Sequence, residues 1–173
     1  MKQTLKFPAR ILVCAALAGS ASLAAVAIPG GIASAAPLTL SCTTLTGTTT
    51  VTATSSTEHL SGCSGTAKTL TGTTGTAAVK TNLSTHSGTA TVTWATKKTS
   101  TESYKFTELT GSKNLCPART GYSKLAEAKE TGSVTGGTAT AMKGGAVTAN
   151  ACAYFKGTNH STVYIFNDGP VKV

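Results

Sequence analysis

Short runs in which apolar and polar residues alternate recur along this chain, and they constrain its fold more than any other feature. The clearest run is Gly88 to Thr96, where Ala90, Val92 and Trp94 share one face and threonines occupy the other. A period of two is typical of a strand with one buried face, because successive side chains point to opposite sides of a sheet. Trp94, the only tryptophan, is therefore expected in the core.

The same alternation predicts further strands. Tyr104 and Phe106 share a face between residues 102 and 109, so this segment and the run before it predict a β-hairpin. In residues 147–155 the odd-numbered apolar side chains share one face, which places Cys152 on the opposite face. Glu102 and Glu108 are expected to face solvent near the ends of their strand.

About eight short strands, separated by Gly, Ser and Asn, predict an all-β fold. We expect an antiparallel β-sandwich, immunoglobulin-like or related, because a thin core suits two small sheets that face each other. A small β-barrel is the alternative. Residues 123–130 contain good helix formers, and a strand or a single helical turn fits them equally well.

The N-terminal 35 residues have the three parts of a cleavable secretory signal peptide. Basic residues precede an apolar stretch from Ile11 to Ile28, and Ala33-Ser34-Ala35 supplies the small side chains needed for cleavage after Ala35. A retained membrane anchor is the alternative, and the cleavage site argues against it. We therefore expect residues 36–173 to form one β-rich domain, secreted or associated with the cell wall, with no membrane span after cleavage.

Composition excludes some function classes for the mature chain. The three basic residues of the signal leave with it, which lowers the formal net charge from +9 to +6. The remaining lysines form no run longer than Lys97-Lys98, so nucleic-acid binding is not expected. Leu, Ile, Val and Phe number only 21 after the signal, but the 34 threonines there favour strands, so we expect an ordered domain.

Four cysteines follow the signal: Cys42, Cys63, Cys116 and Cys152. An even number in an exported chain indicates two disulfides. Of the three pairings we favour Cys42–Cys63 and Cys116–Cys152, which close the two local loops; a link from Cys42 to either later cysteine is the alternative. The cysteines lack the close spacing of metal sites, and we expect neither a metal nor a cofactor.

No catalytic motif is present. The sequence contains no G-x-S-x-G nucleophile elbow, no H-E-x-x-H pair and no phosphate-binding loop, and its histidines are scattered. We therefore expect a protein that is not an enzyme.

One short loop is a candidate interaction site. Pro117, Ala118 and Arg119 follow Cys116, and a disulfide-tethered loop that contains proline is typical of the reactive loops of small secreted protease inhibitors. Such loops bind tightly because little entropy is lost on docking. An ordinary turn beside a structural disulfide is the alternative.

A row of threonines is the second candidate surface. Threonine occupies every even position from 44 to 54, so Thr46, Thr48, Thr50 and Thr52 form a hydroxyl ladder if this segment is one strand. Such a face suits a carbohydrate, ice or another sheet edge, whereas a merely soluble outer face is the alternative. The partner we expect is an extracellular protein or a cell-envelope carbohydrate.

The chain carries a series of short motifs: LTLSC, LTGT, LSGCSG, GTATVTW, CPA, GSVTGGTA and ANAC. This order, from Leu38 to Cys152, resembles small secreted Thr/Gly-rich proteins of actinobacteria. The resemblance implies a β-rich fold and the pairing Cys42–Cys63 and Cys116–Cys152, and it implies no activity. We therefore expect a secreted, non-enzymatic binding or surface-interaction module, with protease inhibition as the alternative.

Overall fold

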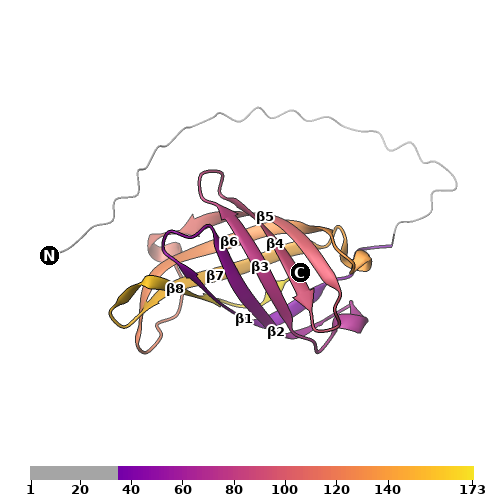
Figure 1. Cartoon of the computed structure of the whole chain (residues 1–173), viewed down its shortest axis with the longest axis horizontal. Helices are drawn as coiled ribbons and strands as arrows, with labels where there is room; N and C mark the ends of the chain where they lie inside the picture. Colours follow the sequence, from indigo (N-terminus) through magenta and orange to yellow (C-terminus); the bar gives the residue numbers. More distant parts are fainter. Residues whose placement is uncertain (1–34) are drawn as a thin grey trace. The chain divides into compact units, whose positions relative to one another are not determined.

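The structure is a computed structural model, and it describes residues 35–173. The expected signal peptide lies almost entirely outside the described residues. Within them the chain forms nine strands and three short 3-10 helices (Figure 1). The strands are β1 (Leu40–Thr50), β2 (Ser55–Gly65), β3 (Gly75–Asn82), β4 (Ser87–Trp94), β5 (Thr99–Leu109), β6 (Tyr122–Gly136), β7 (Ala146–Lys156), β8 (Asn159–Asn167) and β9 (Val171–Lys172), and the helices are η1 (Lys68–Leu70), η2 (Gly111–Lys113) and η3 (Thr140–Met142).

The first eight strands form a closed antiparallel β-barrel. Each strand pairs with the next one along the chain, and β1 also pairs with β8, where Thr46 lies opposite Phe166 and Thr48 lies opposite Tyr164. The short strand β9 pairs with β1 and β7 beside this seam. The expected β-sandwich is therefore wrong, and the alternative, a small β-barrel, matches the structure. The decisive pairing joins segments from opposite ends of the described chain, which local alternation does not reveal.

Local features of the strands were predicted correctly. Ala90, Val92 and Trp94 are buried on one face of β4, and β4 and β5 form the expected hairpin. Residues 123–130 belong to β6 and are therefore strand, which settles the choice that the sequence left open. In β7, Cys152 lies on the face opposite Val147 and Ala149.

The two ends of the barrel are packed differently. At one end η1 and η3 contribute Leu70 and Met142, both fully buried, and these pack in the same core cluster as Trp94 and Leu40. At the other end lie the β1–β2, β3–β4, β5–β6 and β7–β8 connections; β5–β6 contains η2, which has no buried residue. The first end is therefore closed by large apolar side chains, and the second is called here the open end.

Both expected disulfides are present. Cys42 and Cys63 lie directly opposite each other on β1 and β2, and Cys116–Cys152 ties the β5–β6 connection to the outer wall of β7. Each bond closes a loop in the unfolded chain, of 21 and 36 residues respectively. In a loop-entropy estimate a closure of this size is worth about 3–4 kcal/mol.

Removing the first disulfide provides a direct test of this estimate. The double variant Cys42→Ala/Cys63→Ala is expected to lose about 3 kcal/mol of unfolding free energy in a denaturant titration. The neighbouring cross-strand pair Thr44 and Ser61 supplies the control, because replacing both by Ala changes the same strands without opening a loop. A loss below about 1 kcal/mol for the cysteine variant would show that this bond contributes little.

Candidate functional site

A cavity of about 210 Å³ opens inside the barrel at its open end. A second void of about 30 Å³ lies deeper, and four side chains line both spaces: Glu58, Val79, Tyr104 and Glu130. These four residues therefore form the floor of the larger cavity, which we call the open-end cavity.

Small inward-facing side chains create this space. Ala126, Ala128, Ala151 and Ala153 line it from β6 and β7, where larger residues would fill the barrel. Gly47 on β1 leaves space for the Glu58 side chain, because a Cβ there would lie 2.7 Å from Cγ of Glu58. The sequence of this region thus produces a ligand-sized hollow in a barrel whose other end is filled.

Three carboxyl groups from three strands converge around the two voids. Glu58 lies on β2, Glu102 on β5 and Glu130 on β6. Glu102 is only 5 % exposed, so the expectation that it faces solvent is wrong; its carboxylate accepts a long hydrogen bond of 3.4 Å from Ser100. Among residues 35–173, no lysine, arginine or histidine lines either space, so none of these side chains supplies a compensating positive charge there.

This environment raises the pKa of each carboxyl. Burial raises the pKa of Glu102 to about 8, and the charge on Glu58 adds to the effect. Burial also raises the pKa of Glu130 to about 8, with contributions from the charges on Glu58 and Glu102. For Glu58 burial again raises the pKa, although the hydrogen bond from the Ser56 hydroxyl opposes the increase. A low dielectric disfavours the ionised form, which explains the common direction.

Strand alternation in the sequence carries a signal for two of these carboxyls. Glu58 has the same alternation as Leu60 on β2, and Glu130 has the same alternation as Ala128 on β6. Acidic residues on the apolar face of a strand are unusual, because a buried charge costs free energy unless it is paired. The positions were therefore readable from the pattern, but their convergence across three strands was not.

The expected interaction loop is fixed at several points. Pro117 and Ala118 are exposed, whereas Arg119 is half-buried with its guanidinium carbon 3.9 Å from the centre of the Phe166 ring. The Tyr154 hydroxyl donates a hydrogen bond of 2.7 Å to the Pro117 carbonyl. The loop is thus rigid, but its basic side chain packs on the barrel. Its role as an interaction loop stays a prediction.

A buried glutamate also holds this loop by hydrogen bonds to its backbone. Glu127 is 1 % exposed, and one of its carboxylate oxygens accepts a hydrogen bond of 3.0 Å from the Cys116 amide. In residues 35–173, Cys116, Glu127 and Cys152 form the single group of three potential metal ligands that lie close together. The two sulfurs are bonded to each other and are therefore not free to bind a metal.

The threonine ladder is shorter than expected. Thr46, Thr48 and Thr50 alternate along the outer wall of β1, but Thr52 lies in the turn that follows this strand. The strand ends at Thr50 because the chain turns there into β2. The continuous ladder to position 54 is therefore wrong, and the threonines on β1 remain a candidate surface.

The histidines and the aspartate do not meet at the cavity. His59 lies on the outer wall of β2, His86 packs against Phe106 and His160 packs against Phe155. None of the three lines the open-end cavity, and Asp168 belongs to the turn after β8. The structure therefore brings together carboxyl groups alone, without a histidine to exchange protons with them.

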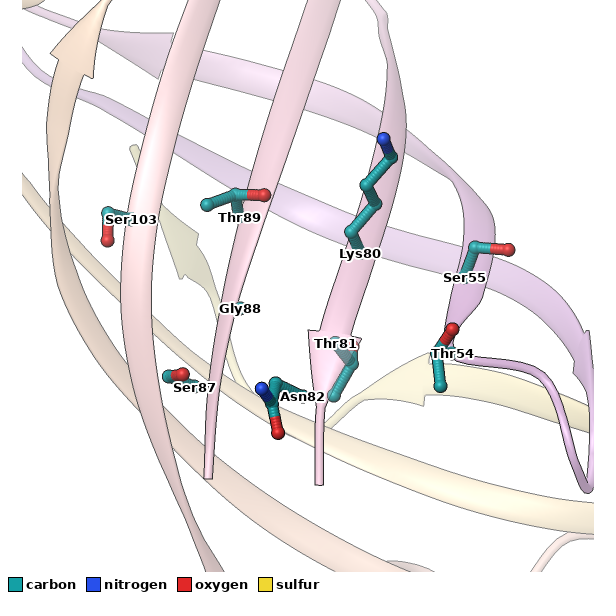
Figure 2. A pocket seen from close by; sticks show the side chains of 9 residues that line it. All are labelled: Thr54, Ser55, Lys80, Thr81, Asn82, Ser87, Gly88, Thr89 and Ser103. Carbon is teal, nitrogen blue, oxygen red and sulfur yellow. The ribbon is translucent and has the colours of Figure 1, made fainter. Parts of the chain in front are cut away.

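A second hollow, of about 580 Å³, lies on the outside of the barrel (Figure 2). Its lining consists mainly of threonine and serine hydroxyls, and Lys80 is its only charged side chain, as Figure 2 shows. The Asn82 side-chain oxygen Oδ1 there already accepts hydrogen bonds from the Ser84 and Thr85 backbone amides of the turn. The hollow is broad and solvated, and no buried polar group points into it.

Comparisons with family models, with curated proteins and with solved structures found no match for this chain. Within residues 35–173, no helix has the length and apolar character needed to cross a membrane.

Proposed function

We propose that this protein is a non-enzymatic extracellular binding protein that holds a small organic cation in the open-end cavity. The observation that carries the proposal is that Glu58 and Glu130 line the open-end cavity and Glu102 lines the smaller void next to it, with no cationic side chain from residues 35–173 in either lining. Two disulfides support a location outside the cell, where such bonds persist.

The chemistry of the floor and walls defines the ligand. Glu58 and Glu130 face the open-end cavity, so an ammonium group beside them would offset the unfavourable burial of their charges. The Ala128, Ala151 and Val163 side chains form an apolar wall that suits an alkyl or aromatic group. The ligand that satisfies both requirements carries one positive charge on a compact apolar body.

A bare divalent metal ion fits the same space less well. Calcium takes six to eight oxygen ligands, and magnesium keeps several waters around it. The lining supplies hydroxyl oxygens besides the two carboxylates, but the alanine and valine side chains offer no ligand, so a bare ion would leave the apolar part of the cavity empty. The volume of about 210 Å³ is also below the range of about 300–1,000 Å³ typical of drug-sized ligands, which points to a small molecule.

Cation binding is expected to depend on pH. Because the pKa of Glu130 is raised to about 8, this carboxyl is largely neutral at pH 6 and becomes ionised towards pH 9. A cation binds the ionised form, so its affinity should rise over this interval and binding below pH 8 should release protons.

Calorimetry with two probes of nearly equal shape tests the proposal. Benzylamine, which is charged at pH 8, is expected to bind more tightly than neutral benzyl alcohol and more tightly at pH 8 than at pH 6. Glu130→Gln is expected to weaken benzylamine binding by about tenfold, equivalent to about 1.4 kcal/mol. Glu108→Gln is the matched control, because Glu108 is exposed near the end of β5, does not line the cavity, and the substitution changes the charge equally.

Two variants distinguish the contribution of the cavity's size to binding from the contribution of its negative charge. Ala151→Leu narrows the cavity and should weaken both probes, whereas Glu130→Gln should weaken only benzylamine. Equal binding of the amine and the alcohol, or an effect of Glu108→Gln as large as that of Glu130→Gln, would contradict the proposal.

The protease-inhibitor alternative has weaker support. An inhibitor needs a side chain displayed to the protease, and the Arg119 guanidinium instead packs over the Phe166 ring. Ala118 remains exposed on a loop held by a disulfide, which is the feature that keeps this alternative open.

A further inference from the structure

A groove of about 350 Å³ runs over the outer wall of the barrel, away from the open-end cavity. Strand pairing arranges its floor in two rows across β8, β1 and β2. Side chains directly opposite each other on neighbouring strands lie about 5 Å apart, so each row is a continuous strip. One row is Phe166, Thr46 and His59, and the other is Tyr164, Thr48 and Thr57; we call this surface the tyrosine groove.

The aromatic side of the tyrosine groove is held rigidly. Tyr122 packs edge-on against Tyr164 and Phe166, with ring centres 5.5 and 5.6 Å apart. Arg119 covers the Phe166 ring, and the same cluster includes the Cys116–Cys152 disulfide. A surface that is already ordered loses little side-chain entropy when it binds a ligand.

The groove carries no fixed charge. No lysine, arginine, aspartate or glutamate lines it, and His59 is its only imidazole. The nearest cations lie beside the lining and not in it: the Arg119 guanidinium packs over the Phe166 ring, and the Lys156 ammonium lies 6.0 Å from the centre of the Tyr122 ring. The lining offers hydroxyl groups that both donate and accept hydrogen bonds, next to half-buried aromatic rings.

The closed barrel also excludes one common kind of protein partner. An extended peptide binds a sheet by pairing with a free strand edge. Strands β1, β2 and β8 are each paired on both sides, so they present only side chains at this surface. The groove therefore suits a neutral ligand that offers C–H faces and hydroxyl groups in alternation.

We propose that the tyrosine groove binds a neutral oligosaccharide. The C–H face of a pyranose ring packs on Tyr164, while its hydroxyl groups hydrogen-bond with Thr46 and Thr48. A volume of about 350 Å³ lies within the range of about 300–1,000 Å³ typical of ligand sites. This site is separate from the open-end cavity, so it does not depend on the proposed cation.

Titration with two soluble neutral probes, cellotetraose and the tetramer of N-acetylglucosamine, tests this inference. At least one probe is expected to bind and to shift the NMR signals of Tyr122, Tyr164 and His59. Binding should be insensitive to added salt, because no ion pair forms. Tyr164→Ala is expected to lower the affinity by about tenfold or more, as truncation of a central aromatic contact does.

Variants with small structural effects keep the test decisive. Thr48→Val removes one groove hydroxyl without changing shape and should weaken binding, whereas Thr91→Val removes an exposed hydroxyl on β4 and should not. Tyr164→Phe retains the ring and should retain most of the affinity. Binding of neither probe at millimolar concentration, or equal binding by Thr48→Val, Tyr164→Ala and the unmodified protein, would overturn the inference. Competition by benzylamine would place the sugar in the cavity and would also overturn it.

Discussion

Glu102→Gln is expected to stabilise the protein by about 3–5 kcal/mol at pH 9 and to change its stability little at pH 5. Glu102 is 5 % exposed, and burial raises the pKa of its carboxyl from 4.5 to about 8. The charged or ionisable groups that face it are Glu58, Tyr104 and Glu130, and none of them is cationic. Gln keeps the acceptor oxygen for Ser100 and removes the charge.

The direction of the pH dependence of stability follows from proton binding to Glu102. Between pH 4.5 and 8 the folded protein holds a proton on Glu102 that the unfolded chain has released, so stability falls as pH rises through this interval. The unmodified protein should therefore be more stable at pH 5 than at pH 9, and Glu102→Gln should flatten this dependence. Urea titrations at the two pH values measure the effect, with Glu108→Gln as the exposed control. A pH profile unchanged by Glu102→Gln would show that this carboxyl is solvated.

Trp94→Ala is the second substitution with a large expected effect. The indole is 1 % exposed at the closed end of the barrel, so its removal leaves a large void, and buried aromatic-to-alanine changes cost about 3–5 kcal/mol. The backbone of Gly75 lies so close that a Cβ there would be 3.0 Å from Cε3 of the indole. The neighbouring strand packs directly against the indole ring, so its backbone has little freedom to move into the void that Trp94→Ala would leave.

Trp94→Phe separates packing from hydrogen bonding. The indole Nε1 is buried and has no hydrogen-bond partner among the described residues, so its loss removes no hydrogen bond. Phe leaves a smaller void than Ala, and the expected loss is at most half that of Trp94→Ala. Thermal and chemical unfolding measure both values. A loss for Trp94→Ala below about 1 kcal/mol would show that the closed end repacks around the missing ring.

Local chemistry made the strands and disulfides predictable. Alternation in residues 88–96 identifies Trp94 as a core residue without any knowledge of the fold, because strand side chains alternate between two faces. The two local cysteine pairs form as expected, with sequence separations of 21 and 36 residues. Residues 123–130 escaped prediction because strong helix formers there are overridden by pairing with β5 and β7.

The candidate site was less predictable from the sequence than the strands were. Glu58 and Glu130 each lie on the inward-facing side of their strand. No local sequence pattern shows that these two sides face the same cavity. Glu58 on β2 meets Glu102 on β5 and Glu130 on β6, and these strands are far from β2 in the sequence. The raised pKa values therefore belong to the assembled interior and not to any one segment.

The sequence by itself indicated most of the strands, the apolar face of the clearest ones and the favoured pairing of the cysteines. Period-two alternation and short loops act over a few residues, so a single segment carries that information. Only the tertiary structure decided between a sandwich and a barrel, because the pairing of β1 with β8 is a contact between distant segments. Closure of that seam also created the open-end cavity and brought Tyr164 and Phe166 beside Thr46 and Thr48.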